Sequence, residues 1–299
     1  MLGARTMRVL VTGGTGLVGK PVCDALRAAG HSVTIVSREP GRVPARAVGW
    51  DGLRGVMPET DAIVNLAGDP IAGGRWTEAR KAEIRRSRIE GTRALVDAIA
   101  ASDSRPTVLV SASAIGYYGD RGDEPLDETA RPGTGFLARV CVEWEAEARR
   151  AEVLGLRVVL PRIGIVLAPD GGAVSAMLLP FRAGLGGSLG SGRQWMSWVH
   201  RDDVVGIIRE AVAKDAYAGP VNATSPHPVT NKDFTRALGR ALHRPTILPI
   251  PSFGLRLLVG EMASMLLGGQ RVLPGVAQRL GYEWRQPELP AALETCIGP

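Results

Sequence analysis

The chain has 299 residues, of which 45% are hydrophobic and 22% charged, and its formal net charge is +6. This hydrophobic fraction supports a sizeable buried core and excludes an intrinsically disordered chain. The 36 lysines and arginines are interleaved with 30 acidic residues instead of gathering in one segment, so the positive charge does not predict nucleic-acid binding. We expect the charge to serve a small anionic ligand.

The first 165 residues alternate short runs of β-branched residues with segments of helical spacing. Valine- and isoleucine-rich strands that alternate with helices are typical of a parallel sheet covered on both faces. The predicted strands are residues 8–12, 32–37, 62–66, 107–111 and 157–160, and the predicted helices are residues 18–29, 78–101 and 137–154. We therefore predict an α/β fold, a Rossmann doubly wound parallel sheet, with a dinucleotide-binding domain at residues 1–165.

The second half differs from the first in its residue composition and hydrophobic pattern. Residues 163–199 are rich in glycine, proline and apolar residues without a clear period, whereas residues 202–213 and 231–242 have helical spacing. We predict that residues 166–299 return to the sheet and also form a smaller C-terminal substrate lobe.

The composition also bounds the compartment. The three cysteines, Cys23, Cys141 and Cys296, form neither a CxxC pair nor a zinc-ligand spacing, so we expect no disulfide framework and no metal site. Residues 1–6 lack the apolar core of a signal peptide and are expected to be a short leader. Residues 253–267 are apolar but interrupted by charges, which predicts an amphipathic helix and not a membrane span. These features favour a cytoplasmic protein without a membrane partner.

A glycine-rich loop directly follows the first predicted strand and precedes a helix. Its sequence is TGGTGLVG at residues 12–19, and this strand–loop–helix context is the one in which such a loop binds a dinucleotide. Glycines permit a tight turn, close approach of the backbone to a pyrophosphate and close helix–strand packing. The helix N-terminus adds unpaired N–H groups and the positive end of its dipole. The predicted cofactor-binding residues here are Gly13, Gly14, Thr15, Gly16, Leu17, Val18 and Gly19.

The end of the second predicted strand predicts which dinucleotide is bound. NAD binders carry an acidic residue at about this distance after the glycine loop, where it accepts a hydrogen bond from the ribose 2′-hydroxyl. This chain has Ser37 and Arg38 there, and a hydroxyl beside a guanidinium suits a 2′-phosphate. We therefore predict NADP(H), with NAD(H) as the alternative because Glu39 is close by.

Several segments together resemble the extended short-chain dehydrogenase/reductase superfamily, in its NAD-dependent epimerase/dehydratase group. They are TGGTGLVG at 12–19, DAIVNLAG at 61–68, VSASAIGYYGD at 110–120, PRIGIVLAPDGG at 161–172 and WVHRDDVV at 198–205. More narrowly, the chain resembles epimerase family proteins with a C-terminal domain of unknown function. The segments shared with those are an RW…RK…I…SR pattern at 75–88, GSGRQWMSWVH at 190–200 and GEMASMLLGGQRVLP at 260–274.

The resemblance implies further cofactor contacts. Leu66, Ala67 and Gly68 would line the cofactor near its sugar and nicotinamide, where close backbone approach favours small residues. Arg162 closes the last strand of the first half and would lie in the crevice where this fold binds its ligands.

The resemblance also raises a catalytic question. Relatives that transfer a hydride use a serine to hold the substrate oxygen, and a tyrosine of a YxxxK motif to transfer a proton. Ser113 stands at the expected place of the serine, but residues 135–145, where the motif should lie, contain neither tyrosine nor lysine. We predict Ser113 and Tyr117 as the catalytic residues, with Arg139 as a substitute cation and Tyr118 as the alternative phenol.

The second half adds candidates for substrate binding. The predicted substrate-binding residues are Tyr118, Arg193, Trp198 and His200. Arg193 lies in a segment similar to one that meets substrate or cofactor in relatives, and its guanidinium suits an anionic group. A structural role at the start of the helix that follows is the alternative for His200.

Three functions remain open. The first is an NADP(H)-dependent oxidoreductase or sugar-nucleotide-type epimerase that acts on a small hydroxyl or carbonyl substrate. The second is a catalytically atypical or inactive NADP(H)-binding protein with a regulatory or redox-sensing role, because the YxxxK pair is absent. RNA or DNA binding is the third, and it requires a basic face that the sequence does not show. A homodimer is also left open.

Overall fold

The computed structural model describes residues 6–72, 74–246 and 248–297, so the expected leader lies outside the described residues except for its last position. The central sheet has the strand order β12-β8-β5-β4-β1-β2-β3, and every neighbouring pair is parallel. Its strands are β1 (Arg8–Thr12), β2 (Ser32–Val36), β3 (Ala47–Val48), β4 (Ala62–Asn65), β5 (Val108–Ser111), β8 (Arg157–Ile163) and β12 (Gly219–Ala223), and β6 (Ser113–Ala114) also pairs with β8. This sheet confirms the predicted Rossmann class.

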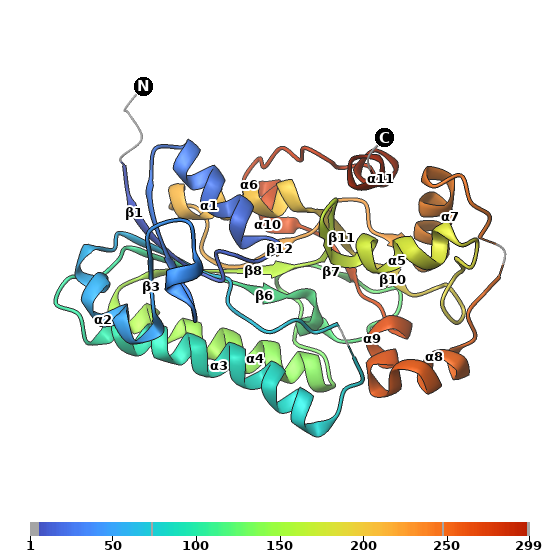
Figure 1. Cartoon of the computed structure of the whole chain (residues 1–299), viewed down its shortest axis with the longest axis horizontal. Helices are drawn as coiled ribbons and strands as arrows, with labels where there is room; N and C mark the ends of the chain where they lie inside the picture. The colour runs from blue at the N-terminus through green and yellow to red at the C-terminus, as the bar shows by residue number, and fades with distance from the viewer. Residues whose placement is uncertain (1–5, 73, 247, 298–299) are drawn as a thin grey trace.

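Helices cover both faces of the sheet, as Figure 1 shows. One layer contains α1 (Gly19–Ala28), α6 (Arg201–Ala213) and α10 (Gly275–Arg279). The opposite layer contains α2 (Leu53–Val56), α3 (Glu78–Ala100) and α4 (Phe136–Arg149). The second half therefore returns to the sheet, because β12 adds an edge strand to it and α6 covers one of its faces.

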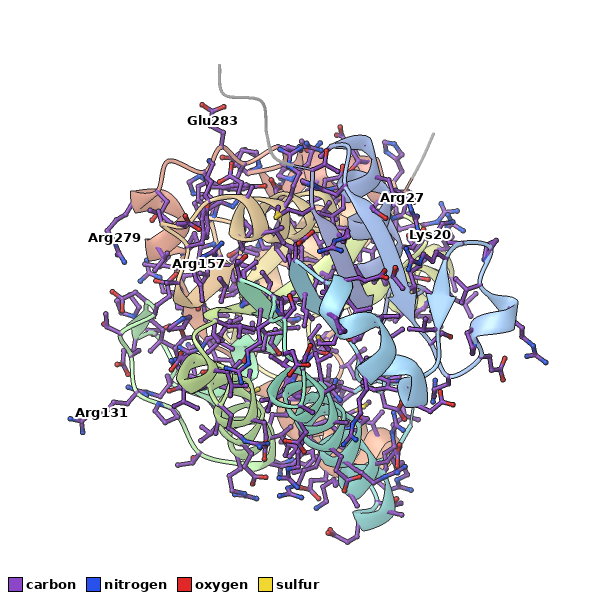
Figure 2. All side chains as sticks on the ribbon, turned by 90° about the vertical axis from the view of Figure 1, so that its left-hand side faces the viewer. Lys20, Arg27, Arg131, Arg157, Arg279 and Glu283 are labelled. Carbon is purple, nitrogen blue, oxygen red and sulfur yellow. The ribbon has the colours of Figure 1, made fainter. Side chains whose placement is uncertain are left out.

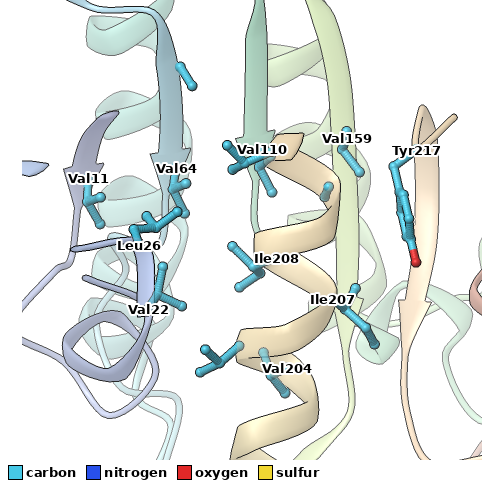
Figure 3. Packing of buried hydrophobic residues seen from close by; sticks show 14 of the residues in the cluster. Val11, Val22, Leu26, Val64, Val110, Val159, Val204, Ile207, Ile208 and Tyr217 are labelled. Atoms are coloured by element: carbon cyan, nitrogen blue, oxygen red, sulfur yellow. The ribbon is translucent and has the colours of Figure 1, made fainter. Parts of the chain in front are cut away.

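The alternation of side chains along each strand explains the two-sided core. Val9 and Val11 of β1 pack with α1 and α6, whereas Leu10 between them packs in the cluster of the α3 and α4 layer. Figure 3 shows Val22 and Leu26 of α1 beside the sheet, together with Ile207 and Ile208 of α6. A strand buried on both faces is apolar throughout, and for this reason these strands were visible in the sequence.

A smaller lobe packs around a separate core that includes Phe181, Trp198 and Phe234. Its elements are β9 (Ile165–Ala168), α5 (Gly172–Arg182), β10 (Trp195–Met196), β11 (Trp198–His200), β13 (Val229–Thr230), α7 (Asn231–Ala241) and α11 (Leu289–Ile297). The remaining elements are β7 (Pro125–Leu126), α8 (Ser252–Val259), α9 (Ala263–Leu267) and β14 (Arg271–Val272), with 3-10 turns at Pro40–Arg42, Trp50–Gly52, Met57–Glu59, Ile115–Tyr118, Glu152–Leu154 and Gly260–Met262.

Two predicted helices differ from the observed ones. The single amphipathic helix expected at residues 253–267 is wrong: α8 and α9 are separated at Gly260, whose φ of 63° cannot continue a right-handed helix. The helix expected at 137–154 ends as α4 at Arg149, and a 3-10 turn follows it. Helical spacing continued through both interruptions, so it did not reveal them.

The surface agrees with the scattered charge of the sequence. In Figure 2 the labelled basic side chains Lys20 and Arg27 lie on a different side of the molecule from Arg131 and Arg279. None of the described helices has the length and apolar character needed to span a bilayer.

Candidate functional site

The glycine loop packs so closely against the sheet that side chains are excluded at two positions. Gly13 has a φ of 67°, and a Cβ on it would lie 2.7 Å from the carbonyl carbon of Leu66. A Cβ on Gly19 would lie 2.0 Å from the carbonyl oxygen of Gly13, which also accepts a hydrogen bond from the amide of Gly16 at 3.0 Å. Two glycines of the motif are thus required by the turn and by the contact between helix and strand.

The N-terminus of α1 fits a dinucleotide diphosphate. Thr15 and Gly16 are exposed, and within the described chain the amides of Leu17 and Val18 donate no hydrogen bond to a protein acceptor. These groups lie at the positive end of the dipole of a ten-residue helix. The loop therefore offers unpaired backbone donors at the point where the fold places a phosphate.

The glycine loop and the segment after β4 are joined by buried hydrogen bonds. Thr12 Oγ1 donates to Asn65 Oδ1 at 2.6 Å and accepts from the amides of Leu66 and Ala67 at 3.2 Å. The strand order reverses between β1 and β4, and open α/β sheets bind ligands outside the carboxyl ends of the strands at such a point. The predicted cofactor residues after both strands therefore lie side by side at the edge of the sheet where this fold binds its ligands.

The end of β2 presents the residues predicted to select the cofactor. Arg38 is exposed and, among the residues that the structure describes, has no ion-pair partner. Ser37 Oγ accepts a hydrogen bond from the amide of Glu39 at 3.1 Å, and the Glu39 carboxylate forms an ion pair with Arg42 at 2.7 Å. Glu39 is the residue for which NAD(H) was considered as the alternative cofactor, and its carboxylate is paired with a neighbouring arginine.

Beyond the crevice, buried polar side chains form one continuous chain. Ser113 Oγ donates to Glu145 Oε1 at 2.7 Å, and Arg162 donates to the two oxygens of Glu145 at 2.8 and 2.9 Å. Arg162 Nη1 also donates to the hydroxyl of Tyr118 at 2.9 Å, and this hydroxyl donates to Asn222 Oδ1 at 2.7 Å. β6, α4, β8, the turn at residues 115–118 and β12 each supply one member.

The network and its burial shift the pKa values of Arg162 and Tyr118. Burial opposes the charged form of Arg162, but hydrogen bonding and Coulomb attraction to Glu145 outweigh it, so the pKa of Arg162 lies above its usual value. Burial raises the pKa of Tyr118 to about 12, although Arg162 acts in the other direction. Tyr118 therefore remains a neutral phenol near pH 7, with no exposed surface.

Tyr117 differs from its neighbour. It is half-buried, and the guanidinium carbon of Arg162 lies 3.4 Å from the centroid of its ring. Arg139, the cation proposed from the sequence, is exposed on α4. Ser113 and Tyr117 are thus linked indirectly, through Glu145 and then Arg162, a residue expected only to contact the cofactor.

The other substrate candidates have structural contacts. Trp198 has no exposed surface, and its Nε1 donates to the carbonyl of His227 at 2.9 Å. His200 accepts a hydrogen bond from the amide of Asp202 through Nδ1, which caps α6, and burial lowers its pKa. Arg193 is exposed. None of these contacts joins Ser113, and their roles toward a substrate stay predictions.

The sequence interpretation missed Glu145. Its signal was an acidic residue at helical spacing within an apolar face, since Ala138, Cys141 and Ala148 of the same helix are also buried. Cys141 itself is buried, and burial raises the pKa of its thiol to about 12, which agrees with an inert core residue. The described residues contain no group of three or more His, Cys, Asp or Glu side chains that could hold a metal ion.

Comparison with known proteins identifies the family. The model described as NAD dependent epimerase/dehydratase family matches residues 9–223, and a domain of unknown function, DUF1731, matches residues 250–296. An epimerase family protein of Mycobacterium bovis is 44% identical over 293 residues, which cover 95% of this chain and 96% of that protein. The chloroplastic homolog of epimerase family protein SDR39U1 from Arabidopsis thaliana is 42% identical over 306 residues, covering 97% and 87%.

Solved structures agree. The crystal structure of human epimerase family protein SDR39U1 with NADPH has a TM-score of 0.90 and 38% identity, and the match covers 97% of this chain and 99% of the human one. A structure described as the nucleoside-diphosphate sugar epimerase from Corynebacterium glutamicum has a TM-score of 0.80 and 32% identity, covering 99% of this chain and 59% of that one. The predicted superfamily is confirmed, and a nicotinamide dinucleotide is confirmed as the family's cofactor. The chain belongs to the NAD dependent epimerase/dehydratase family, with a DUF1731 domain at its C-terminal end.

Proposed function

We propose that the chain is an NADP(H)-dependent enzyme, an oxidoreductase or sugar-nucleotide-type epimerase, that acts on a small hydroxyl or carbonyl substrate. One observation carries this proposal: Arg162 joins Ser113, through Glu145, to the ring of Tyr117 at the carboxyl ends of β5 and β8. A serine oxygen that can hold a substrate hydroxyl and a phenol that can transfer a proton suit chemistry at a hydroxyl or carbonyl group beside a dinucleotide loop.

The cofactor would be held by groups already described. The loop at residues 13–19 would bind the diphosphate, the backbone at residues 66–68 would border the sugar, and Ser37 with Arg38 would bind a 2′-phosphate. A bound nicotinamide supplies hydride transfer. NADPH in the crystal of human SDR39U1 supports the choice of NADP(H) over NAD(H).

The reacting oxygen would meet Ser113 and Tyr117. The hydroxyl proton of Ser113 points to Glu145, which leaves its oxygen lone pairs free to accept a hydrogen bond from a substrate hydroxyl. Arg162 stacks on Tyr117 and orients its phenol, whose proton would move to or from the substrate oxygen.

The proposal is tested by NADPH oxidation with a panel of aldehydes, ketones and 4-keto sugar nucleotides. We expect Tyr117→Phe and Ser113→Ala each to lower kcat/KM by about 10²–10⁴-fold without weakening NADPH binding. Tyr217→Phe is the matched control, since this buried tyrosine donates to Glu210 of α6 and, in the portion of the chain that the structure describes, contacts no member of the network. Unchanged turnover in both active-site variants would contradict the assignment.

Cofactor choice is tested separately. Titration with NADPH and NADH should show tighter binding of NADPH, and Arg38→Ala should weaken NADPH by about tenfold or more while leaving NADH unchanged. Arg27→Ala, on the exposed end of α1, is the matched control. Equal affinity of the wild-type protein for both dinucleotides would remove Arg38 from this role.

A second function is favoured by one observation. α4 and the glycine before it contain no tyrosine or lysine, and Cys141, Trp144 and Glu145 occupy its buried face. A regulatory or redox-sensing NADP(H)-binding protein would bind NADPH with the same residues, but no compound of the carbonyl panel would cause NADPH oxidation. The two functions therefore give opposite results in one experiment.

A further inference from the structure

An arginine on the buried face of α3 plays no part in the network above. Arg88 is only 9% exposed and belongs to the RW…RK…I…SR pattern that the cofactor and the catalytic pair leave unexplained. Its Nη1 donates to the carbonyl of Ile84, one turn earlier on the same helix, at 3.0 Å. Within the described part of the chain, this guanidinium has no ion-pair partner.

The carboxylate that acts on Arg88 is already engaged by another arginine. Asp69 attracts Arg88 electrostatically, but its carboxylate pairs with Arg80 at 3.4 Å. Burial is the largest influence on Arg88 and lowers the pKa of its guanidinium. A buried, uncompensated charge is destabilising, and proteins keep one where it has a function.

Arg88 lies between Trp144 of α4 and the segment that follows β4. Its guanidinium lies 5.3 Å from the ring of Trp144, whose Nε1 is fixed by a hydrogen bond to Thr92 at 2.9 Å. A Cβ on Gly68 would lie 3.2 Å from Arg88 Cζ and 3.3 Å from Nη2, so the absence of a side chain there leaves room for the guanidinium. Gly68 follows the segment that packs on the glycine loop.

We infer that Arg88 is a specificity-determining residue that binds an anionic oxygen-bearing group of the substrate, a carboxylate or a phosphate, beside Gly68. This inference rests on the proposed function, and it narrows the substrate to an anionic hydroxyl or carbonyl compound. A guanidinium offers two-point contact to such a group, and its position beside Trp144 and the Ile84 carbonyl limits its movement. Arg88 fills a need that Arg162 cannot, because Glu145 already neutralises Arg162.

The test uses the full chain saturated with NADP⁺, with oxalate and inorganic phosphate as probes and uncharged oxamide as the neutral analogue. Binding is measured by calorimetry and by thermal shift. We expect oxalate or phosphate, but not oxamide, to bind the wild-type complex. Arg88→Met should lower the affinity for that anion by about tenfold to a hundredfold. Arg88→Lys, which keeps a cationic group but loses the two-point geometry of the guanidinium, should retain part of the binding. Whichever anion binds distinguishes a carboxylate substrate from a phosphorylated one.

Arg86→Met is the matched control, because Arg86 is exposed on the same helix and pairs with Glu83. Three results would overturn the inference: neither anion binds the wild-type complex, the anion binds Arg88→Met as tightly as wild type, or both Arg88 variants lose affinity for NADPH itself. The last result would assign the guanidinium to the cofactor. A wild-type protein that fails to bind NADPH at all would instead refute the proposed function, so the two failures are distinguishable.

Discussion

At the residue scale, the candidate site depends on one buried ion pair. Glu145 and Arg162 have side chains 5% and 2% exposed, and each is bonded to a second polar group. A buried pair is weak evidence for stability as a whole, but removal of one partner leaves an uncompensated charge. The pair is thus better understood as the device that positions Ser113 and Tyr117.

The first prediction concerns this pair. Glu145→Gln should lower the free energy of unfolding by about 3–5 kcal/mol, because Arg162 would remain buried without its counter-charge. Glu143 lies on the same helix as Glu145 and forms an exposed ion pair with Arg85 of α3, so Glu143→Gln should lower the free energy of unfolding by less than about 1 kcal/mol. Urea unfolding measures both. Equal losses would mean that the pair is solvated.

The second prediction separates steric exclusion from backbone strain. Gly13 and Gly30 both have positive φ, but a Cβ on Gly13 would meet the backbone of Leu66 whereas nothing lies within 4 Å of one on Gly30. Gly13→Ala should therefore abolish NADPH binding, while Gly30→Ala should only cost about 1 kcal/mol of stability. Calorimetric titration of both variants is the measurement. NADPH binding retained by Gly13→Ala would contradict the assigned role of the loop.

At the element scale, α3 and α4 pack side by side and are joined by charged residues. Glu147 of α4 accepts hydrogen bonds from Arg93 of α3 and from Arg150, and the bond from Arg93 is the main reason that the pKa of Glu147 lies below its usual 4.5. This helix pair also carries Arg88 on one helix and Glu145 on the other. Its alignment therefore sets the spacing of the site.

The third prediction is the pH dependence of this contact. A carboxylate whose folded pKa is lowered adds stability above its unfolded pKa of about 4.5, and that stability is lost as the pH falls through the folded pKa. Glu147→Gln should be less stable than wild type at pH 7, and the difference should be lost as the pH falls through the folded pKa, which lies below 4.5. Chemical denaturation across pH 3–7 tests this. In a protein that already carries Arg93→Gln, the stability difference caused by Glu147→Gln should be smaller. A gap that persists at pH 3 would require another explanation.

A buried carboxylate on α6, that of Asp203, binds the start of the C-terminal segment in addition to the apolar packing of α11. Asp203 on α6 has no exposed surface and accepts from the amides of Arg285 and Gln286 at 2.7 and 3.0 Å, and from the hydroxyl of Tyr282 at 3.1 Å. Burial raises the pKa of Tyr282 above its usual value, so this hydroxyl remains a donor.

The fourth prediction follows from these contacts. Asp203→Ala should lower the free energy of unfolding by about 3 kcal/mol or more, because it leaves buried donors unpaired, whereas Tyr282→Phe should cost about 1 kcal/mol. Hydrogen exchange should show faster exchange at residues 280–297 in Asp203→Ala alone. Uniform exchange along the chain in both variants would argue against a local anchor.

At the scale of the whole molecule, one parallel sheet organises both the core and the site. The strand order places the loops after β1, β4 and β5 on one edge, and the second half supplies β12, α6 and the lobe that borders this edge. The oligomeric state stays a prediction.

The fifth prediction links cofactor to global stability. NADPH at a hundred times its Kd should raise the free energy of unfolding by about 2.7 kcal/mol, since only the folded sheet presents the loop. Thermal unfolding at graded NADPH concentrations measures the effect. Gly13→Ala supplies the control, and a transition that does not move with NADPH in the wild-type protein would contradict dinucleotide binding.

The sequence by itself determined the parts of this protein that depend on local pattern. Apolar runs predicted β1, β2, β4 and β5, because strands buried on both faces must be apolar, and the glycine spacing predicted the dinucleotide loop, because the turn tolerates no Cβ. Only the tertiary structure decided which distant side chains meet: Glu145 with Arg162 and Ser113, Arg162 with Tyr117, and Arg88 with Gly68. Those contacts join residues that are tens of positions apart, and charge in a buried network is set by packing in three dimensions, which no spacing along the chain records.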